Sequence, residues 1–347
     1  MFRRSATAVV ALTAAVGLIA GCGGSSSGGK APVSNVSGAT AADELSNALS
    51  GLGQASTLTA TLKLDASGSQ LLDYVRSQNK GTHLSAQQAA LLASGSVTFE
   101  VAAPSGKTIS TMGSLSDDGA ANIDVAAKTG DVITLRVVNK TLYLRASLKD
   151  VLNAAGKAET YRQLVGGSAQ LPPFLSALVQ GKWVSLPLAT LKGLAGSLGA
   201  GTTPSGSAKS NHFLDQLKSL LTKDVTVTKS TSGDTDTLTL TTNLRSFAGD
   251  LETTFTSALP AAGTALNGND LSKVPDKKVS LVATVTGGAL ASLKFDLGQV
   301  AKSGSASLPL ELDFARSGPS IGVPSGAVAV DLSQLAGLFG AFGGGGL

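Results

Sequence analysis

Cysteine, histidine, aromatic and charged residues are all scarce in this chain of 347 residues. One cysteine excludes an intramolecular disulfide, and together with two histidines it leaves little material for a zinc site. Charged residues make up only 14%, with 27 Lys+Arg against 23 Asp+Glu, which does not fit a nucleic-acid-binding protein. Hydrophobic residues, at 42%, suffice for a sizeable core. Because aromatics contribute only 4%, that core consists mainly of alanine, leucine and valine.

The N-terminus has the pattern of a bacterial lipoprotein signal. A short basic region precedes an apolar stretch from about residue 6 to 20, and Leu18-Ile19-Ala20-Gly21-Cys22 resembles a lipobox. We therefore expect removal of residues 1–21 and a diacylglyceryl anchor on Cys22, with an unmodified thiol as the alternative. No later apolar run reaches the roughly 18 residues needed to span a bilayer. The sequence predicts a lipid-anchored protein on the extracytoplasmic face of the cell membrane.

The processed chain divides into three parts by composition. Residues 22–37 are mostly glycine, serine and other small residues, which favours a flexible tether. Residues 38–335 are expected to form one large domain, and the Gly-rich residues 336–347 a frayed tail. The polar segment 199–210 could be a domain linker, but neither half has enough strands to close its own sheet.

Most of the domain alternates between apolar and polar residues with a period of two, which is typical of strands with one dry and one wet face. The clearest case is 57–64, in which leucine and alanine alternate with threonine and lysine. Further strands are predicted at 97–101, 122–125, 131–138, 141–145, 237–241, 278–285, 290–297 and 310–314. Short turns such as Asn139-Lys140 and Gly287-Gly288 indicate meander connections.

Helical patterns interrupt these strands. The spacing of apolar residues predicts an amphipathic helix over 40–52 with Thr40 as its N-cap. Other helices are expected at 70–76 with 85–93, at 147–153, at 188–198 with 211–221, and at 244–257. The predicted fold class is α+β, an extended antiparallel sheet whose apolar face is covered by helices.

No catalytic or metal-binding motif stands out. His83 and His212 lie in polar surroundings and are interpreted as surface residues. No G-x-S-x-G elbow follows a strand. Ser77-x-x-Lys80, a Ser-Asp-Asp at 116–118 and Lys128-Thr129-Gly130 occur in penicillin-binding-protein order, but too close together for that fold. We expect no enzyme activity, no metal and no cofactor.

The apolar face of the sheet has two interpretations. In the first interpretation, the helices pack directly on this face and leave no cavity, as is the rule for protein cores. Alternatively, sheet and helices stand apart and enclose a dry cavity, which binds hydrocarbon rather than water. Composition does not separate the two.

A family resemblance favours the cavity. The lipobox, the helix 40–52 before a Thr-rich strand, the hairpin 135–144, Gly181-Lys182-Trp183-Val184, and Leu310-Glu311-Leu312-Asp313-Phe314 with Val323-Pro324 are together similar to the actinobacterial LppX/LprG-type lipoproteins. These resemble the LolA and LolB carriers. The resemblance implies a curved, half-barrel antiparallel sheet, helices on its concave apolar face, and carriage of acylated lipids or lipoglycans. The segments 66–95 and 193–211 are extra, and form lids or fill the cavity.

The resulting hypothesis is a non-enzymatic, monomeric carrier held to the membrane by its diacylglyceryl-cysteine, with acylated lipid or lipoglycan as ligand and no nucleic-acid partner. The alternative is a structural or sensory cell-envelope lipoprotein with a filled core. The candidate lining positions are Leu58, Ala60, Leu62, Val97, Phe99, Val101, Leu238, Leu240, Leu281, Ala283, Phe295 and Leu297.

Overall fold

The structure is a computed structural model that describes residues 40–78, 84–112, 119–127, 130–154, 157–168, 171–190, 225–247, 249, 274–300, 307–318 and 320–331. Cys22, His83, His212, the tether and the Gly-rich tail lie outside these ranges. So do the segment 193–211 and most of the helix expected at 244–257.

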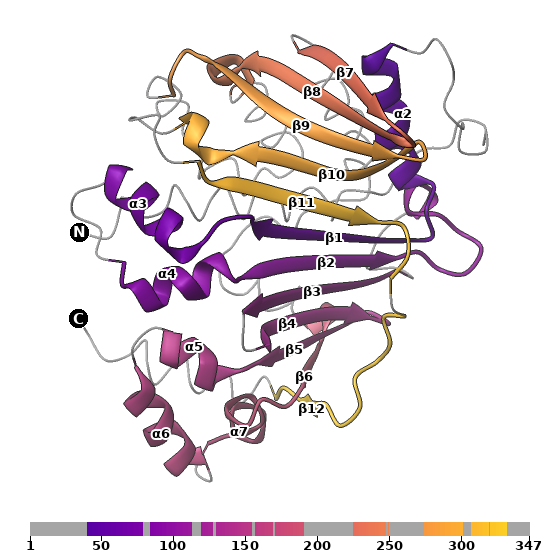
Figure 1. Ribbon diagram of the computed structural model, residues 1–347. Coiled ribbons are helices and arrows are strands. Elements are labelled where there is room, and N and C mark those ends of the chain that lie inside the picture. The colour runs from indigo at the N-terminus through magenta and orange to yellow at the C-terminus, as the bar shows by residue number, and fades with distance from the viewer. Residues whose placement is uncertain are drawn as a thin grey trace.

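One large sheet of twelve strands forms the centre of the molecule (Figure 1). Its strands are β1 (Thr57–Leu64), β2 (Ser96–Ala102), β3 (Ala120–Ala127), β4 (Gly130–Val138), β5 (Thr141–Ala146), β6 (Val184–Pro187), β7 (Thr226–Ser232), β8 (Thr235–Asn243), β9 (Lys278–Thr286), β10 (Ala289–Asp296), β11 (Pro309–Ala315) and β12 (Val328–Ala329). All neighbouring pairs are antiparallel except β12 with β6. The predicted α+β class with an extended antiparallel sheet is confirmed, but the sheet is open and uncurled and is not the curved half-barrel that the resemblance implied.

The strand order shows two meanders joined side by side. It runs β12-β6-β5-β4-β3-β2-β1-β11-β10-β9-β8-β7. The first meander is β1 to β6 and the second β7 to β11, and they meet where β1 pairs with β11. One sheet thus continues through both halves of the chain. It stays open, with β7 at one edge and the short β12 at the other.

The β4–β5 hairpin has the turn that the sequence predicted. Asn139 and Lys140 have φ of 50° and 58°, the left-handed values that a two-residue type I′ turn requires at both central positions. Asparagine tolerates this conformation, whereas for lysine it is strained. In the β9–β10 hairpin, Gly287 and Gly288 adopt the same left-handed conformation without strain, at φ of 56° and 74°.

Lys140→Gly is therefore expected to stabilise the protein. Glycine removes a left-handed strain of about 1–2 kcal/mol, and its greater freedom in the unfolded chain offsets up to about 1 kcal/mol of that gain. We expect the free energy of unfolding in urea to rise by about 0.5–1 kcal/mol. A fall in stability would contradict the turn assignment, and Lys107→Gly, at an exposed lysine next to Gly106, serves as control.

Among the described residues, the sheet is flanked by the helices α2 (Ala41–Gly53), α3 (Gly68–Gln78), α4 (Ala86–Ala93), α5 (Leu148–Ala154), α6 (Ala158–Gly166) and α7 (Pro173–Val179); short 3-10 turns are η1 (Ile109–Thr111) and η4 (Leu297–Val300). α2 begins at Thr40, whose hydroxyl accepts a hydrogen bond from the Asp43 backbone N–H while its own backbone N–H donates to the Asp43 carboxylate. This reciprocal capping box fixes the start of α2.

Three apolar clusters hold the helices to the sheet. The largest joins Leu45, Ala48 and Leu52 of α2 to apolar side chains of β1, β2, β8, β9 and β10. The second packs α3 and α4 around Leu308. The third packs Phe174 and Ala177 of α7 on Val184 of β6.

A connector crosses the polar side of the sheet on its way from β11 to β12 (Figure 1). The Thr57 hydroxyl donates to the carbonyl of Arg316, and Arg136 donates to the carbonyl of Gly322, 3.0 Å away. Gly318 passes so close to Thr59 that a Cβ at this position would lie 2.7 Å from the threonine oxygen. The connector thereby brings β12 beside β6, where it forms the last strand at that edge of the sheet.

Candidate functional site

The register of the strands places the predicted lining positions on one face of the sheet. Opposed residues can be followed from strand to strand in a single row. From β7 to β5 the row reads Lys229, Leu238, Ala283, Leu293, Leu312, Leu62, Val97, Val125, Ile133 and Ala146. Every residue except the first is apolar. We call this side the inner face.

Eleven of the twelve predicted positions lie on strands of this face. Parallel rows contain Ala60 with Phe99 and Leu58 with Val101. Leu240 opposes Leu281, which in turn opposes Phe295. The twelfth, Leu297, follows β10 in η4 and packs with the α3–α4 cluster.

The inner face is not covered evenly. Seven of the predicted positions are fully buried in the cluster around α2: Leu58, Ala60, Phe99, Val101, Leu238, Leu240 and Ala283. Leu62 is also buried, whereas Val97, Leu281 and Phe295 are only half-buried. Since α2 contacts β7, β9 and β10, it fills the face toward the β7 edge.

The middle of the first meander carries apolar inner residues that the lining prediction omitted. On β3, β4 and β5 these side chains are half-buried, so they keep contact with solvent. We name them the central apolar surface; it consists of Ile123, Val125, Ile133, Leu135, Val137 and Leu142. The alternation at 122–125 and 131–138 was visible in the sequence and was the available signal.

Helices border the central apolar surface on two sides. α2 lies toward β7, and α7 covers the end formed by β5, β6 and β12, where Leu144 and Val328 contact its cluster. An extended apolar strip between two helices, on a sheet whose opposite face is polar, is complementary to a long hydrocarbon chain.

The opposite face is rich in threonine and charge. Lys63 pairs with Asp313 at 2.6 Å, and Lys294 with Asp65 at 2.9 Å. The Thr61 and Thr98 hydroxyls are hydrogen-bonded at 3.2 Å. Near the β6 edge, Trp183 stacks with the guanidinium groups of Arg136 and Arg145, 5.2 and 5.0 Å from its ring centroid. The charged and polar side chains of this face thus pair with one another, as is usual on a solvent-exposed face.

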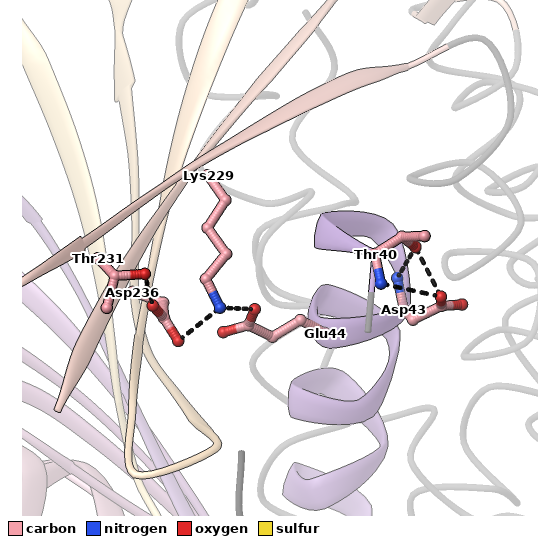
Figure 2. A network of polar contacts seen from close by, with 6 residues as sticks. All are labelled: Thr40, Asp43, Glu44, Lys229, Thr231 and Asp236. Atoms are coloured by element: carbon pink, nitrogen blue, oxygen red, sulfur yellow. Dashed lines mark hydrogen bonds and ion pairs between the residues drawn. The ribbon is translucent and has the colours of Figure 1, made fainter. Parts of the chain in front are cut away.

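One charged cluster interrupts the inner face, at the β7 edge (Figure 2). The Lys229 ammonium contacts Glu44 of α2 at 2.5 Å and Asp236 of β8 at 3.0 Å. Thr231 donates to Asp236 at 2.5 Å. Asp236 is only 5% exposed at its side chain, and the second carboxylate oxygen of Glu44, Oε1, is buried without a hydrogen-bond partner. The cluster ties the first turn of α2 to the edge of the sheet.

Burial and hydrogen bonding shift the pKa values of this cluster in opposite directions. Burial raises the pKa of Glu44 above its ordinary 4.5, although the hydrogen bond from Lys229 opposes the shift. The pKa of Asp236 is lowered to about 2, mainly by the Thr231 hydrogen bond and then by Glu44 and Lys229. The pKa of Lys229 is raised by hydrogen bonds to the two carboxylates. Glu44 is thus the member that takes up a proton first on acidification.

The described residues contain few side chains that could bind a metal ion or act in catalysis. Within those ranges, no three His, Cys, Asp or Glu side chains lie close enough together to hold a metal ion. In the same part of the chain, no helix combines the length and apolarity needed to cross a bilayer. Lys80, the Ser-Asp-Asp triplet and Lys128-Thr129 lie outside the described residues, so the interpretation of those motifs stays a prediction.

Comparison with known proteins finds similarity only among solved structures. No family model matches the chain, and no curated protein matches it. The crystal structure of LprF from Mycobacterium bovis is similar at a TM-score of 0.36 and 11% identity, over 85% of this chain and 100% of that chain. The lipoprotein LppX from Mycobacterium tuberculosis is similar at a TM-score of 0.31 and 10% identity, over 81% and 98% of the two chains. Both belong to the mycobacterial LppX/LprG group of lipoproteins, the group that the sequence resembles.

Proposed function

We propose that this protein is a non-enzymatic lipoprotein, anchored by Cys22 to the extracytoplasmic face of the cell membrane, that binds or carries an acylated lipid or lipoglycan on the inner face of its sheet. The observation that supports the proposal most directly is the central apolar surface. Six aliphatic side chains of three adjacent strands remain half-buried there, while the opposite face of the same strands is polar. Transfer of a hydrocarbon chain from water to such a surface is favourable by a free energy of about 25 cal/mol per Å² of apolar area buried.

The predicted lining positions have different roles in this proposal. The half-buried Val97 opposes Val125 of the central apolar surface and contacts acyl chains together with it. The half-buried Leu281 and Phe295 lie farther along the inner face, on β9 and β10, and contact a chain that extends toward the second meander. The fully buried positions, such as Phe99 and Leu238, support this surface from the adjacent core. Leu297 supports the region from the α3–α4 cluster.

The proposal is tested on protein purified from its own host. Native mass spectrometry followed by organic extraction is expected to detect an acyl lipid that copurifies with the wild type. Leu135→Glu places a carboxylate on the central apolar surface, and an ionised carboxylate has a large desolvation penalty next to hydrocarbon. We expect lipid occupancy, and the affinity for a fluorescent fatty acid, to fall by about tenfold or more.

Thr239→Glu is the matched control, because it adds the same charge on the polar face of β8. It should leave binding unchanged. Circular dichroism of both variants verifies that they are folded. Absence of any acyl lipid from the wild type, or equal binding by the two variants, would favour the alternative, a structural or sensory lipoprotein with a filled core.

A further inference from the structure

The end of the sheet near β6 carries a lobe of three small helices. α5 contacts α6 and α7, and the chain returns from α7 directly into β6. In Figure 1 the three helices form the lower left corner of the molecule, away from α2. We call α5, α6, α7 and the turn 180–183 the helical lobe.

Positive charge is concentrated in this part of the chain. Residues 130–187, which include the lobe and the strands that support it, contain 7 Lys+Arg and 3 Asp+Glu. The whole chain has 27 Lys+Arg and 23 Asp+Glu, and two of the arginines precede residue 22. The remainder of the chain from residue 22 therefore contains 18 Lys+Arg and 20 Asp+Glu. One end of the molecule is therefore basic while the rest is slightly acidic.

Three lysines supply charge on the surface of the lobe itself. Lys149 lies on α5, Lys157 precedes α6, and Lys182 lies in the turn before β6. All three are exposed, and none forms an ion pair with a described residue. Arg162 of α6, by contrast, pairs with Glu159 at 2.7 Å. Within the described residues, no carboxylate neutralises these three charges.

α6 also has an apolar side that is not buried. Tyr161, Leu164 and Val165 follow the spacing i, i+3, i+4 and so share one side of the helix. No residue of α6 is buried, and Val165 is 44% exposed. Tyr161 and Leu164 are half-buried, since α6 packs against α5. An amphipathic helix with a partly exposed apolar side near exposed lysines has the composition of a helix that lies at a membrane interface.

We propose that the helical lobe is a second membrane contact that docks on an anionic lipid surface, with α6 against the acyl boundary and Lys149, Lys157 and Lys182 toward the lipid phosphates. Charge complementarity selects this partner, because the three exposed lysines attract anionic headgroups while the apolar side of α6 enters the interface. The inference rests on the proposed function only for the Cys22 anchor that brings the lobe near a membrane. Docking would hold the domain in one orientation relative to the bilayer.

The test uses residues 22–347 with Cys22→Ser, so that no acyl anchor contributes. Cosedimentation is measured with vesicles of phosphatidylcholine alone and with vesicles of equal phosphatidylcholine and phosphatidylglycerol. We expect binding to the anionic vesicles only, and release at high salt. Each lysine near an anionic surface improves partitioning about fivefold, so Lys149→Gln/Lys157→Gln/Lys182→Gln should weaken binding about a hundredfold. Val165→Ser should weaken it further.

The control variant Lys107→Gln/Lys277→Gln/Lys278→Gln removes the same charge from elsewhere on the surface and should bind as the parent does. Absence of binding to anionic vesicles, or equal loss in the two triple variants, would overturn the inference. Fatty-acid binding, measured on the same proteins, separates the two proposals. The lobe variant should retain it, and a parent that docks on vesicles without binding fatty acid would contradict the proposed function alone.

Discussion

Leu238→Ala is expected to lower the free energy of unfolding by about 3 kcal/mol. Leu238 is 0% exposed and lies in the largest cluster, in which Leu45 of α2 is equally buried. Truncation removes three buried carbons and leaves a cavity that a helix packed on a twelve-stranded sheet cannot readily collapse. For buried leucines these two effects together amount to about 2.7–5 kcal/mol. Urea unfolding followed by circular dichroism measures the change.

The matched control is Leu92→Ala, the same truncation at a residue that is 55% exposed on α4. It should change the free energy of unfolding by no more than about 0.5 kcal/mol. If Leu238→Ala were as mild as Leu92→Ala, α2 would not be packed on the inner face. The fully buried lining positions would then be open to a ligand.

Local periodicity predicted most of the strands because one of their faces is buried and the other is wet. β1 lies at residues 57–64 as expected, and β2, β3, β4, β8, β9 and β11 contain their predicted ranges. β10 runs from Ala289 to Asp296 and so lies one residue before the predicted range 290–297 at each end. The helix at 40–52 was equally predictable, since its N-cap and apolar spacing both act within a single helix.

The sequence analysis missed β6, the edge strands β7 and β12, and the helices α6 and α7. β7 has the sequence Thr-Val-Thr-Lys-Ser-Thr-Ser, in which even the inner positions are largely polar, because an edge strand is exposed on both sides. β12 has only two residues. The pairing of β1 with β11 joins segments about 250 residues apart, and no local pattern specifies such a contact.

The sequence predicted which side of the sheet carries the candidate site, but not which part of that side stays accessible. Alternation assigned Ala60, Leu62 and Phe99 to the inner face, and the register confirms that they share it. Which part of the face stays accessible depends on where α2 and α7 pack, and helix packing is a long-range property. For this reason the sequence emphasised positions near α2 and omitted Ile133 and Leu135.

The charged cluster was missed for a related reason. Lys229 and Asp236 are neighbours in the β7–β8 hairpin, but Glu44 is 185 residues from Lys229. Only the docking of α2 against β7 brings Glu44 to the two hairpin residues (Figure 2). A lysine in the middle of an otherwise Thr- and Ser-rich edge strand was the single available signal.

Lys229→Met is expected to destabilise the protein strongly at neutral pH and much less in mild acid. Without the ammonium group, the buried carboxylates of Glu44 and Asp236 face each other with like charge. The pKa of Glu44, already raised by burial, should rise further in the variant. As the pH falls through that pKa, Glu44 takes up a proton, shares it with Asp236, and the repulsion disappears.

The sign of the pH dependence follows from the direction of each shift. A carboxyl whose pKa is raised on folding binds its proton more tightly in the native state, so its contribution to stability grows as the pH falls toward 4.5, the ordinary value for Glu44. Asp236 acts the other way. With its pKa lowered to about 2, its contribution is present above its ordinary 3.8 and is lost between there and about 2. The difference in stability between the variant and the wild type should therefore shrink steadily as the pH falls from neutral to 4.5.

Urea unfolding of wild type and Lys229→Met across this pH range, from neutral to about 4.5, measures the difference directly. Lys278→Met is the matched control, since Lys278 is exposed on β9 and forms no ion pair with a described residue. It should shift the urea midpoint little and by the same amount at every pH. A Lys229→Met effect that is independent of pH would mean that Glu44 and Asp236 are not close enough to share a proton, and that the first turn of α2 is not tied to the sheet edge by charge.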